Sequence, residues 1–159
     1  MSVSLAVPVY FFDSSALVKR YGAEIGTTWV TRLCDPEHGN VIAVARITLA
    51  EVAAALASKR RANAITLMEY DQALQDVKDD FQECVRQDVD QAVIDWAVEL
   101  TQHHKLRGYD AVQLASALTL NTLLVQQQLA PLTFVASDHD LLAAAQGEGL
   151  ATEDPTRHP

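Results

Sequence analysis

The stretch that decides the fold is "VPVYFFDSSALVKRY", which runs from Val7 to Tyr21. It begins with an apolar, β-forming run over 7–12, which is typical of a strand buried on both faces of a sheet. The run ends at a carboxylate, Asp13, and a helical pattern begins at the serines that follow. A carboxylate at the end of a buried strand predicts a helix cap, a ligand site, or both.

The rest of the chain repeats this alternation of strand and helix. Further strands are expected over 40–45, 84–87 and 132–137, with a last edge strand beginning near 150–151. Helical patterns separate them, over 15–22, 24–36, 48–63, 66–83, 90–104, 109–129 and 138–149. Strands separated by helices form parallel sheets that are covered on both faces. We therefore expect an α/β fold, a three-layer α/β/α sandwich with a central, mostly parallel sheet of four to five strands.

Length and composition indicate one globular domain. The chain has 159 residues, of which 49% are apolar and 21% are charged, and this composition excludes a disordered chain. We expect a single domain over 1–150 and a flexible, frayed tail over 151–159. The longest apolar stretch, 41–57, is interrupted by Arg46 and Glu51, so it is too short and too charged to cross a bilayer.

Two features indicate a cytoplasmic protein. The N-terminal "MSVSLAVPVYFF" has neither a basic region nor a small-residue cleavage site, so we expect no export signal. Cys34 and Cys84 lie far apart and form no metal-spaced pair, which favours free thiols over a disulfide.

The net charge of −9 comes from 12 basic and 21 acidic side chains. Taken alone, this charge argues against a nonspecific nucleic-acid binder, which usually carries a basic face. It permits a cation site that gathers some of the acids, or a basic partner.

Four acids fall at positions where they can meet. Asp13 and Asp138 follow expected strands, Glu51 lies in the first turn of the third helix, and Asp110 opens the long apolar helix. In parallel sheets, ligands bind beyond the carboxyl ends of the strands, which is where Asp13 and Asp138 are expected. Converging carboxylates repel one another unless one is protonated or a cation lies between them. Mg²⁺ prefers oxygen ligands and keeps several waters, so it suits such a site.

Helix capping offers a second interpretation of the same acids. Thr48 and Glu51 have the T-x-x-E spacing of a capping box, Asp13 and Asp138 precede helices, and Asp110 favours its helix dipole. The two interpretations are compatible, since a cap can also aim a carboxylate.

Four blocks of the chain carry a resemblance to a known family. "FFDSSALVKRY", "TLAEVAAAL", "LRGYDAVQLASAL" and "FVASDHDLLAAAQGEGL" resemble, in order, the blocks of PIN-domain ribonucleases, and more narrowly those of VapC toxins. The match covers 7–150. It implies a PIN-like form of the sandwich, and catalytic, metal-binding acids at Asp13, Glu51, Asp110 and Asp138. It also implies a hydroxyl role for Ser14 or Ser15, in holding a metal-bound water or in capping, and it leaves Asp140 as an extra acid that could assist.

The resemblance implies a metal-dependent endoribonuclease that cleaves single-stranded or looped RNA with Mg²⁺, or with Mn²⁺ in its place. Metal-activated water fits the sequence, which has no Ser-His-Asp order and no H-E-x-x-H motif. Both a one-ion and a two-ion site are compatible with the sequence. The implied role is the toxin of a type II toxin–antitoxin pair, inhibited by a cognate VapB-type antitoxin and paired as a homodimer, with no membrane association. The alternative is a PIN-domain nuclease that processes RNA outside such a pair.

Several other side chains have two interpretations each. The candidates for RNA backbone contacts are Lys19, Arg20, Lys59, Arg60, Arg61, Lys105 and Arg107. The basic run 59–61 is also typical of a solvated helix end that complements its dipole. His103 and His104 are expected to be exposed residues that end a helix, and Trp29 and Trp96 are expected to be core residues.

Two rival classes of function remain. Phosphoryl-aspartate enzymes also place an Asp after the first strand. The haloacid-dehalogenase pattern, however, needs a second Asp where this chain has Ser15. Receiver domains need a paired acid near the first strand and a lysine after the last core strand, and this chain shows neither clearly. The other class is a non-catalytic interaction module whose acids only cap helices. Stabilisation by Mn²⁺ would distinguish a cluster of acids from helix caps.

Overall fold

Five strands form one parallel sheet in the computed structural model, which describes residues 6–159. The strands are β1 (Val9–Phe12), β2 (Val41–Ala45), β3 (Val85–Gln87), β4 (Thr133–Val135) and β5 (Ala151–Glu153). They lie in the order β3-β2-β1-β4-β5, and every neighbouring pair is parallel. The expected parallel sheet is confirmed. The first five residues lie outside the described residues. They include part of the N-terminal stretch that was expected to lack an export signal, and the start of the expected 1–150 domain.

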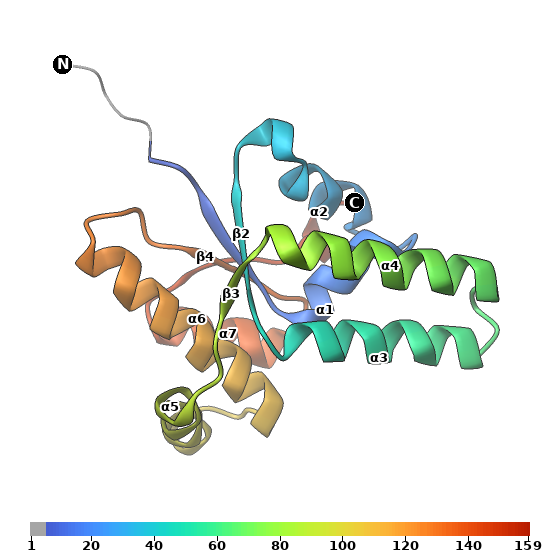
Figure 1. Ribbon diagram of the computed structural model, residues 1–159. Coiled ribbons are helices and arrows are strands. Elements are labelled where there is room, and N and C mark those ends of the chain that lie inside the picture. Colours follow the sequence, from blue (N-terminus) through green and yellow to red (C-terminus); the bar gives the residue numbers. More distant parts are fainter. Residues whose placement is uncertain (1–5) are drawn as a thin grey trace.

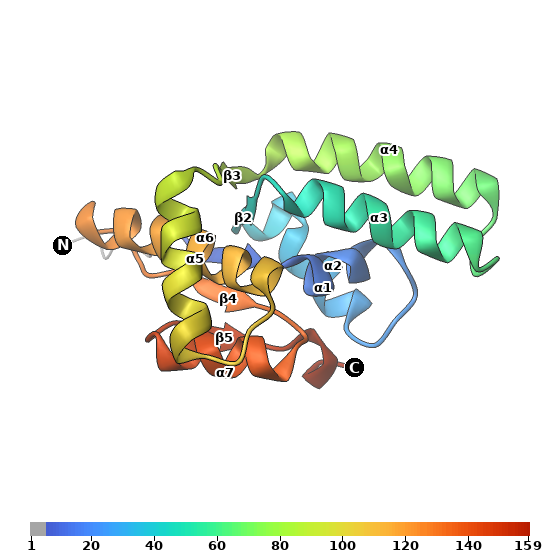
Figure 2. The ribbon, with the colours of Figure 1, turned by 90° about the horizontal axis from the view of Figure 1, so that it is seen from below.

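Helices cover both faces of the sheet, which gives the three layers seen in Figures 1 and 2. One face packs against α1 to α4 and the other against α5 to α7. The α-helices are α1 (Ser14–Leu17), α2 (Thr27–Cys34), α3 (Thr48–Arg61), α4 (Leu67–Glu83), α5 (Gln91–His103), α6 (Gly108–Gln126) and α7 (His139–Gly147), with 3-10 turns over Val18–Tyr21, Pro36–His38 and Pro155–Arg157.

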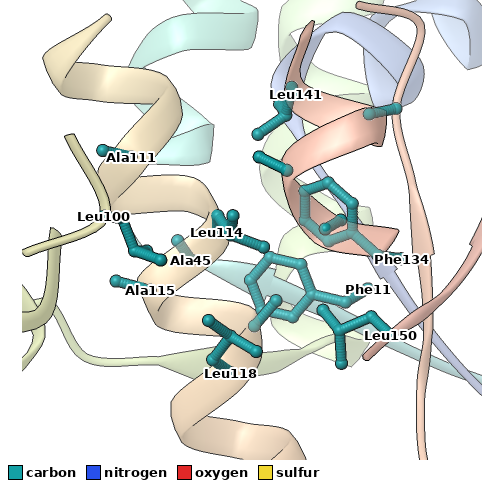
Figure 3. Packing of buried hydrophobic residues seen from close by; sticks show 14 of the residues in the cluster. Phe11, Ala45, Leu100, Ala111, Leu114, Ala115, Leu118, Phe134, Leu141 and Leu150 are labelled. Atoms are coloured by element: carbon teal, nitrogen blue, oxygen red, sulfur yellow. The ribbon is translucent and has the colours of Figure 1, made fainter. Parts of the chain in front are cut away.

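Two consecutive residues of β1 anchor the two helical layers. Phe11 and Phe12 are both fully buried, and because side chains alternate along a strand they enter opposite cores. Phe11 stacks on Phe134 with ring centroids 6.0 Å apart, beside Leu114 and Leu118 of α6 (Figure 3). Burying each such side chain stabilises the fold by about 1.5–3 kcal/mol.

The strand order changes direction between β1 and β4. The chain steps outward from β1 to β2 and β3, then returns to the other side of β1 to form β4 and β5. The backbone N–H of Asp13 donates to the carbonyl of Val135 at 3.0 Å, so the carboxyl ends of β1 and β4 lie together. Crevices at such a reversal are where ligands bind in open parallel sheets.

The C-terminal segment is a correction to the sequence prediction. The frayed tail expected over 151–159 instead forms β5, paired with β4, and a 3-10 turn over Pro155–Arg157. His158 stacks on Trp29 of α2 with ring centroids 4.3 Å apart and planes 3° apart. Trp29 lies in the first quarter of the chain, so the polar composition of the C-terminal segment gave no sign of this contact.

The two cysteines are free thiols, as expected. Burial raises the pKa of both the Cys34 and the Cys84 thiol to about 11, which keeps them protonated and poorly nucleophilic. Within residues 6–159, no helix has the length and apolar character needed to span a membrane.

Candidate active site

Asp13 is a buried carboxylate at the junction of β1 and α1. Its side chain caps α1 by accepting the Ala16 N–H at 3.0 Å, and both its oxygens accept from the Ser15 hydroxyl, at 2.8 and 2.9 Å. The residue is only 2% exposed. Burial is the largest cause of the shift that raises the pKa of Asp13 to about 7. Hydrogen bonds from Ser15 and Ala16 lower this pKa, whereas the nearby Asp110 charge raises it.

Ser15 connects the ends of the two central strands. Its hydroxyl oxygen accepts the backbone N–H of Ser137 at 3.2 Å while its hydrogen is donated to Asp13. The neighbouring Ser14 hydroxyl instead donates to Glu51 at 2.8 Å. The two serines after the first strand therefore hold two different acids.

Glu51 is fixed by donors on both of its carboxylate oxygens. Ser14 donates to Oε2, and the side-chain amide of Gln113 on α6 donates to Oε1 at 2.8 Å. The same amide nitrogen donates to the hydroxyl of Thr48 at 2.9 Å. Gln113 and Thr48 are essentially fully buried, so this polar link between α3 and α6 is shielded from water and correspondingly strong.

Asp110 and Asp138 complete the set of predicted acids. Asp110 lies in the first turn of α6 and is buried, whereas Asp138 caps α7 by accepting the Leu141 N–H at 2.9 Å. Burial is the first cause that raises the pKa of Asp110, followed by the Asp138 charge, while Arg107 lowers it and Glu51 raises it. The negative charges of Asp138 and Glu51 therefore act on the Asp110 carboxylate.

All four predicted acids line one cavity of about 220 Å³, together with Arg107 and Tyr109. Arg107 approaches the Oδ2 atoms of Asp110 and Asp138, at 3.6 and 3.9 Å. Within the described part of the chain, no three His, Cys, Asp or Glu side chains form a group that could hold a metal ion as they stand. Four oxygen donors around one cavity nevertheless match Mg²⁺ chemistry, because this ion takes one or two carboxylates and keeps waters on its other positions.

Capping explains part of the pattern, as the sequence allowed. Asp13 and Asp138 both cap helices while lining the cavity. The capping box expected for Thr48 and Glu51 is wrong, because α3 begins at Thr48 itself and has no side-chain cap. The Thr48 hydroxyl is instead bonded to Gln113, which lies 65 positions away, a partner that local spacing could not indicate.

Gln113 is the residue of the site that the sequence analysis missed. Its signal was a lone amide inside the apolar run "DAVQLASAL", which forms the buried N-terminal half of α6. A buried polar side chain in such a place requires a hydrogen-bond partner. That requirement would have singled out Gln113, though not its contact with Glu51.

The cavity lined by the four acids is called the acid cavity below. The remaining candidate residues lie away from it or at its edge. Lys19 and Lys59 both pair with Glu24, and Arg20 pairs with Asp80. Asp140 is exposed and lies 3.5 Å from Lys105, beside the cavity rather than in it. His103 is exposed as expected, whereas His104 is half-buried beside Glu148. Trp29 and Trp96, expected in the core, are partly buried and pack against the two cores.

Comparison with known proteins identifies relatives of this chain. No protein-family model matches it. A protein named Ribonuclease VapC45, from Mycobacterium tuberculosis (strain CDC 1551 / Oshkosh), is 34% identical over 114 residues, which cover 72% of this chain and 78% of that protein.

Two solved structures share the fold along almost the whole chain. PAE2754 from Pyrobaculum aerophilum superposes with a TM-score of 0.63 at 18% identity, covering 96% of this chain and 94% of the other. VapBC2 from Rickettsia felis, bound to a DNA fragment from its promoter, gives a TM-score of 0.59 at 16% identity, covering 92% and 98%.

Proposed function

Since this chain belongs to the family of VapC ribonucleases, we propose that it is a metal-dependent endoribonuclease that cleaves single-stranded or looped RNA. The observation that carries the proposal is the common cavity of Asp13, Glu51, Asp110 and Asp138. These acids come from four separate parts of the fold. Helix capping alone gives no reason for them to line one cavity.

We assign Asp13, Glu51, Asp110 and Asp138 to hold Mg²⁺, or Mn²⁺ in its place. When bound, the cation stabilises negative charge on the phosphate and makes a water more acidic. Glu51, whose two oxygens already accept hydrogen bonds, keeps its orientation during this chemistry. Asp13, with a pKa raised to about 7, can exchange a proton with water near neutral pH in the absence of the cation.

Membership of the same family supports two partners for this chain, an antitoxin and a second copy of itself. Solved relatives of this fold are VapBC toxin–antitoxin complexes, which supports a VapB-type antitoxin as the inhibitor of this chain and a toxin role in the cytoplasm. A basic antitoxin segment would complement the net charge of −9. Exposed apolar side chains such as Leu123, Val125 and Leu129 on and just after α6 offer surface for the expected homodimer.

The proposal is tested by mapping new RNA ends. The purified protein is incubated with total cellular RNA and Mg²⁺, and the ends are sequenced. Asp13→Asn and Asp110→Asn should reduce cleavage at least a hundredfold, as expected when a transition-state electrostatic contact is removed. Asp71→Asn, at an exposed position of α4, is the matched control and should cleave normally. A fully active Asp13→Asn protein would refute the assignment.

A further inference from the structure

Arg107 is the single positively charged side chain that lines the acid cavity among the residues the structure describes. Its Nε atom lies 3.6 Å from Asp110 Oδ2, and its Nη2 atom lies 3.9 Å from Asp138 Oδ2. One guanidinium therefore lies beside two of the acids assigned to the cation. Its single positive charge offsets part of the negative charge of the two carboxylates in the arrangement seen here.

The guanidinium is held loosely in this position. Both distances exceed the range of good hydrogen bonds, and the Arg107 side chain is 69% exposed. Its Cζ atom lies 5.3 Å from the centroid of the Tyr109 ring, within reach of a cation–π contact. The guanidinium thus lies near the aromatic ring in the same position from which it approaches the two carboxylates, so the ring contact does not depend on the ion pairs.

The Arg107 side chain does not cap α6, the helix that begins directly after it. Arg107 is the N-cap residue of α6, but its side chain makes no capping hydrogen bond. The bond that matters there is from Ala111 N–H to the backbone carbonyl of Arg107, and every substitution retains it. Replacing the side chain should therefore leave the fold intact.

We propose that Arg107 is an internal counter-ion of Asp110 and Asp138, that a divalent cation displaces it, and that the freed guanidinium then binds a phosphate of the RNA strand. The first step is an exchange of cations, because two carboxylates cannot both retain a guanidinium and accept a doubly charged ion in the same place. The second step uses the planar fork of donors that makes arginine suited to phosphate. The inference deepens the proposed function and depends on it.

Cation binding without RNA tests the first step. Binding of Mn²⁺ to the RNA-free protein is measured by calorimetry for the wild type, Arg107→Gln, Arg107→Lys and Arg32→Gln. Arg107→Gln should bind Mn²⁺ about three- to tenfold more tightly, since it removes a competing charge of ordinary surface strength. Arg107→Lys should return toward the wild-type affinity. Arg32→Gln makes the same charge change at an exposed position of α2 that does not line the cavity, and it should match the wild type.

RNA binding and cleavage test the second step. At saturating Mn²⁺, Arg107→Gln should raise KM for a short single-stranded RNA by roughly tenfold, because it loses one charged phosphate contact. The same variant would thus bind the ion more tightly and the substrate more weakly, a combination that general damage to the fold would not produce. Added salt should weaken RNA binding less steeply for Arg107→Gln than for the wild type.

Unchanged or weaker Mn²⁺ binding by Arg107→Gln overturns the counter-ion role, and an unchanged KM overturns the phosphate contact. In either case a wild type that binds Mn²⁺ and cleaves RNA leaves the proposed function standing. If instead the wild type neither binds Mn²⁺ nor cleaves RNA, the proposed function fails, and the inference fails with it.

Discussion

Gln113 on α6 donates its side-chain amide to Glu51 on α3 at 2.8 Å, although the two residues are 62 positions apart in the chain. The same nitrogen also serves Thr48. Gln113 therefore joins the two helices that carry Glu51 and Asp110, and it fixes the carboxylate of Glu51 without being an acid itself. We regard it as a positioning residue.

Gln113→Leu should test this role. The substitution keeps a similar volume but removes the donor to Thr48 and one of the two donors to Glu51, so the free energy of unfolding should fall by about 1–3 kcal/mol. Cleavage should fall by roughly ten- to a hundredfold because Glu51 is then held on one oxygen only. Gln126→Leu, at the exposed end of the same helix, is the matched control, with an expected change in stability of under about 0.5 kcal/mol. Equal stability and cleavage in the two variants would exclude the positioning role.

The stability of the metal-free protein should depend on pH through Asp13. This carboxyl has an ordinary pKa of 3.8 in the unfolded chain and a pKa of about 7 in the fold. Between these values the folded protein holds a proton that the unfolded chain has released. Stability should therefore fall as pH rises through this window, by at most about 1.4 kcal/mol per pH unit from this group.

Asp13→Asn should remove that part of the pH dependence, because asparagine does not titrate and can still accept the Ala16 N–H. Urea unfolding in the presence of EDTA, from about pH 5 to about pH 8, measures the difference. The advantage of the variant over the wild type should be smallest at the acidic end and largest at the alkaline end. A variant less stable than the wild type at about pH 8 would show that the charged carboxylate stabilises the fold.

Divalent cations should stabilise the protein through the acid cavity. A ligand present at a hundred times its dissociation constant stabilises the folded state by about 2.7 kcal/mol, so Mn²⁺ should raise the melting temperature of the wild type and excess EDTA should stop cleavage. Asp138→Asn should lose most of the Mn²⁺ effect. Asp140→Asn should keep it, because Asp140 is exposed and does not line the acid cavity. The reverse ranking of these two variants would move the site to Asp140.

The C-terminal segment should be required for stability. Gly26 has φ +93°, and a Cβ added there would lie 2.5 Å from the carbonyl oxygen of Pro155. Gly26→Ala should cost more than about 2 kcal/mol, since it adds a collision to the backbone strain. Gly39→Ala is the matched control, because Gly39 has φ +68° with no atom within 4 Å of an added Cβ; it should cost about 1 kcal/mol. Equal costs would mean that Pro155 does not press on Gly26.

Sequence reasoning reached the sheet and the acids because both are encoded locally. Apolar runs that end in Asp13 and shortly before Asp138 predict strands, and the geometry of parallel strands brings their ends together. Ordinary helix patterns likewise predicted the helix starts that carry Glu51 and Asp110. No partner at long range is needed for any of these inferences.

Contacts between distant segments were beyond the same reasoning. The hydrogen bond from Gln113 to Thr48 replaced an expected capping box, and the stacking of His158 on Trp29 replaced an expected frayed end. Arg107 was expected to meet RNA, but its approach to Asp110 and Asp138 depends on how one loop lies against the sheet edge. Local periodicity carries no information about such pairings.

The acid cavity draws on residues from near the start of the chain to near its end, and Asp138 belongs to the turn after the fourth strand. A ribosome that stops before that codon therefore releases a product without the full set of carboxylates. The proposed ribonuclease therefore stays incomplete on the nascent chain until Asp138 has been synthesised and has joined the three acids that precede it in the sequence.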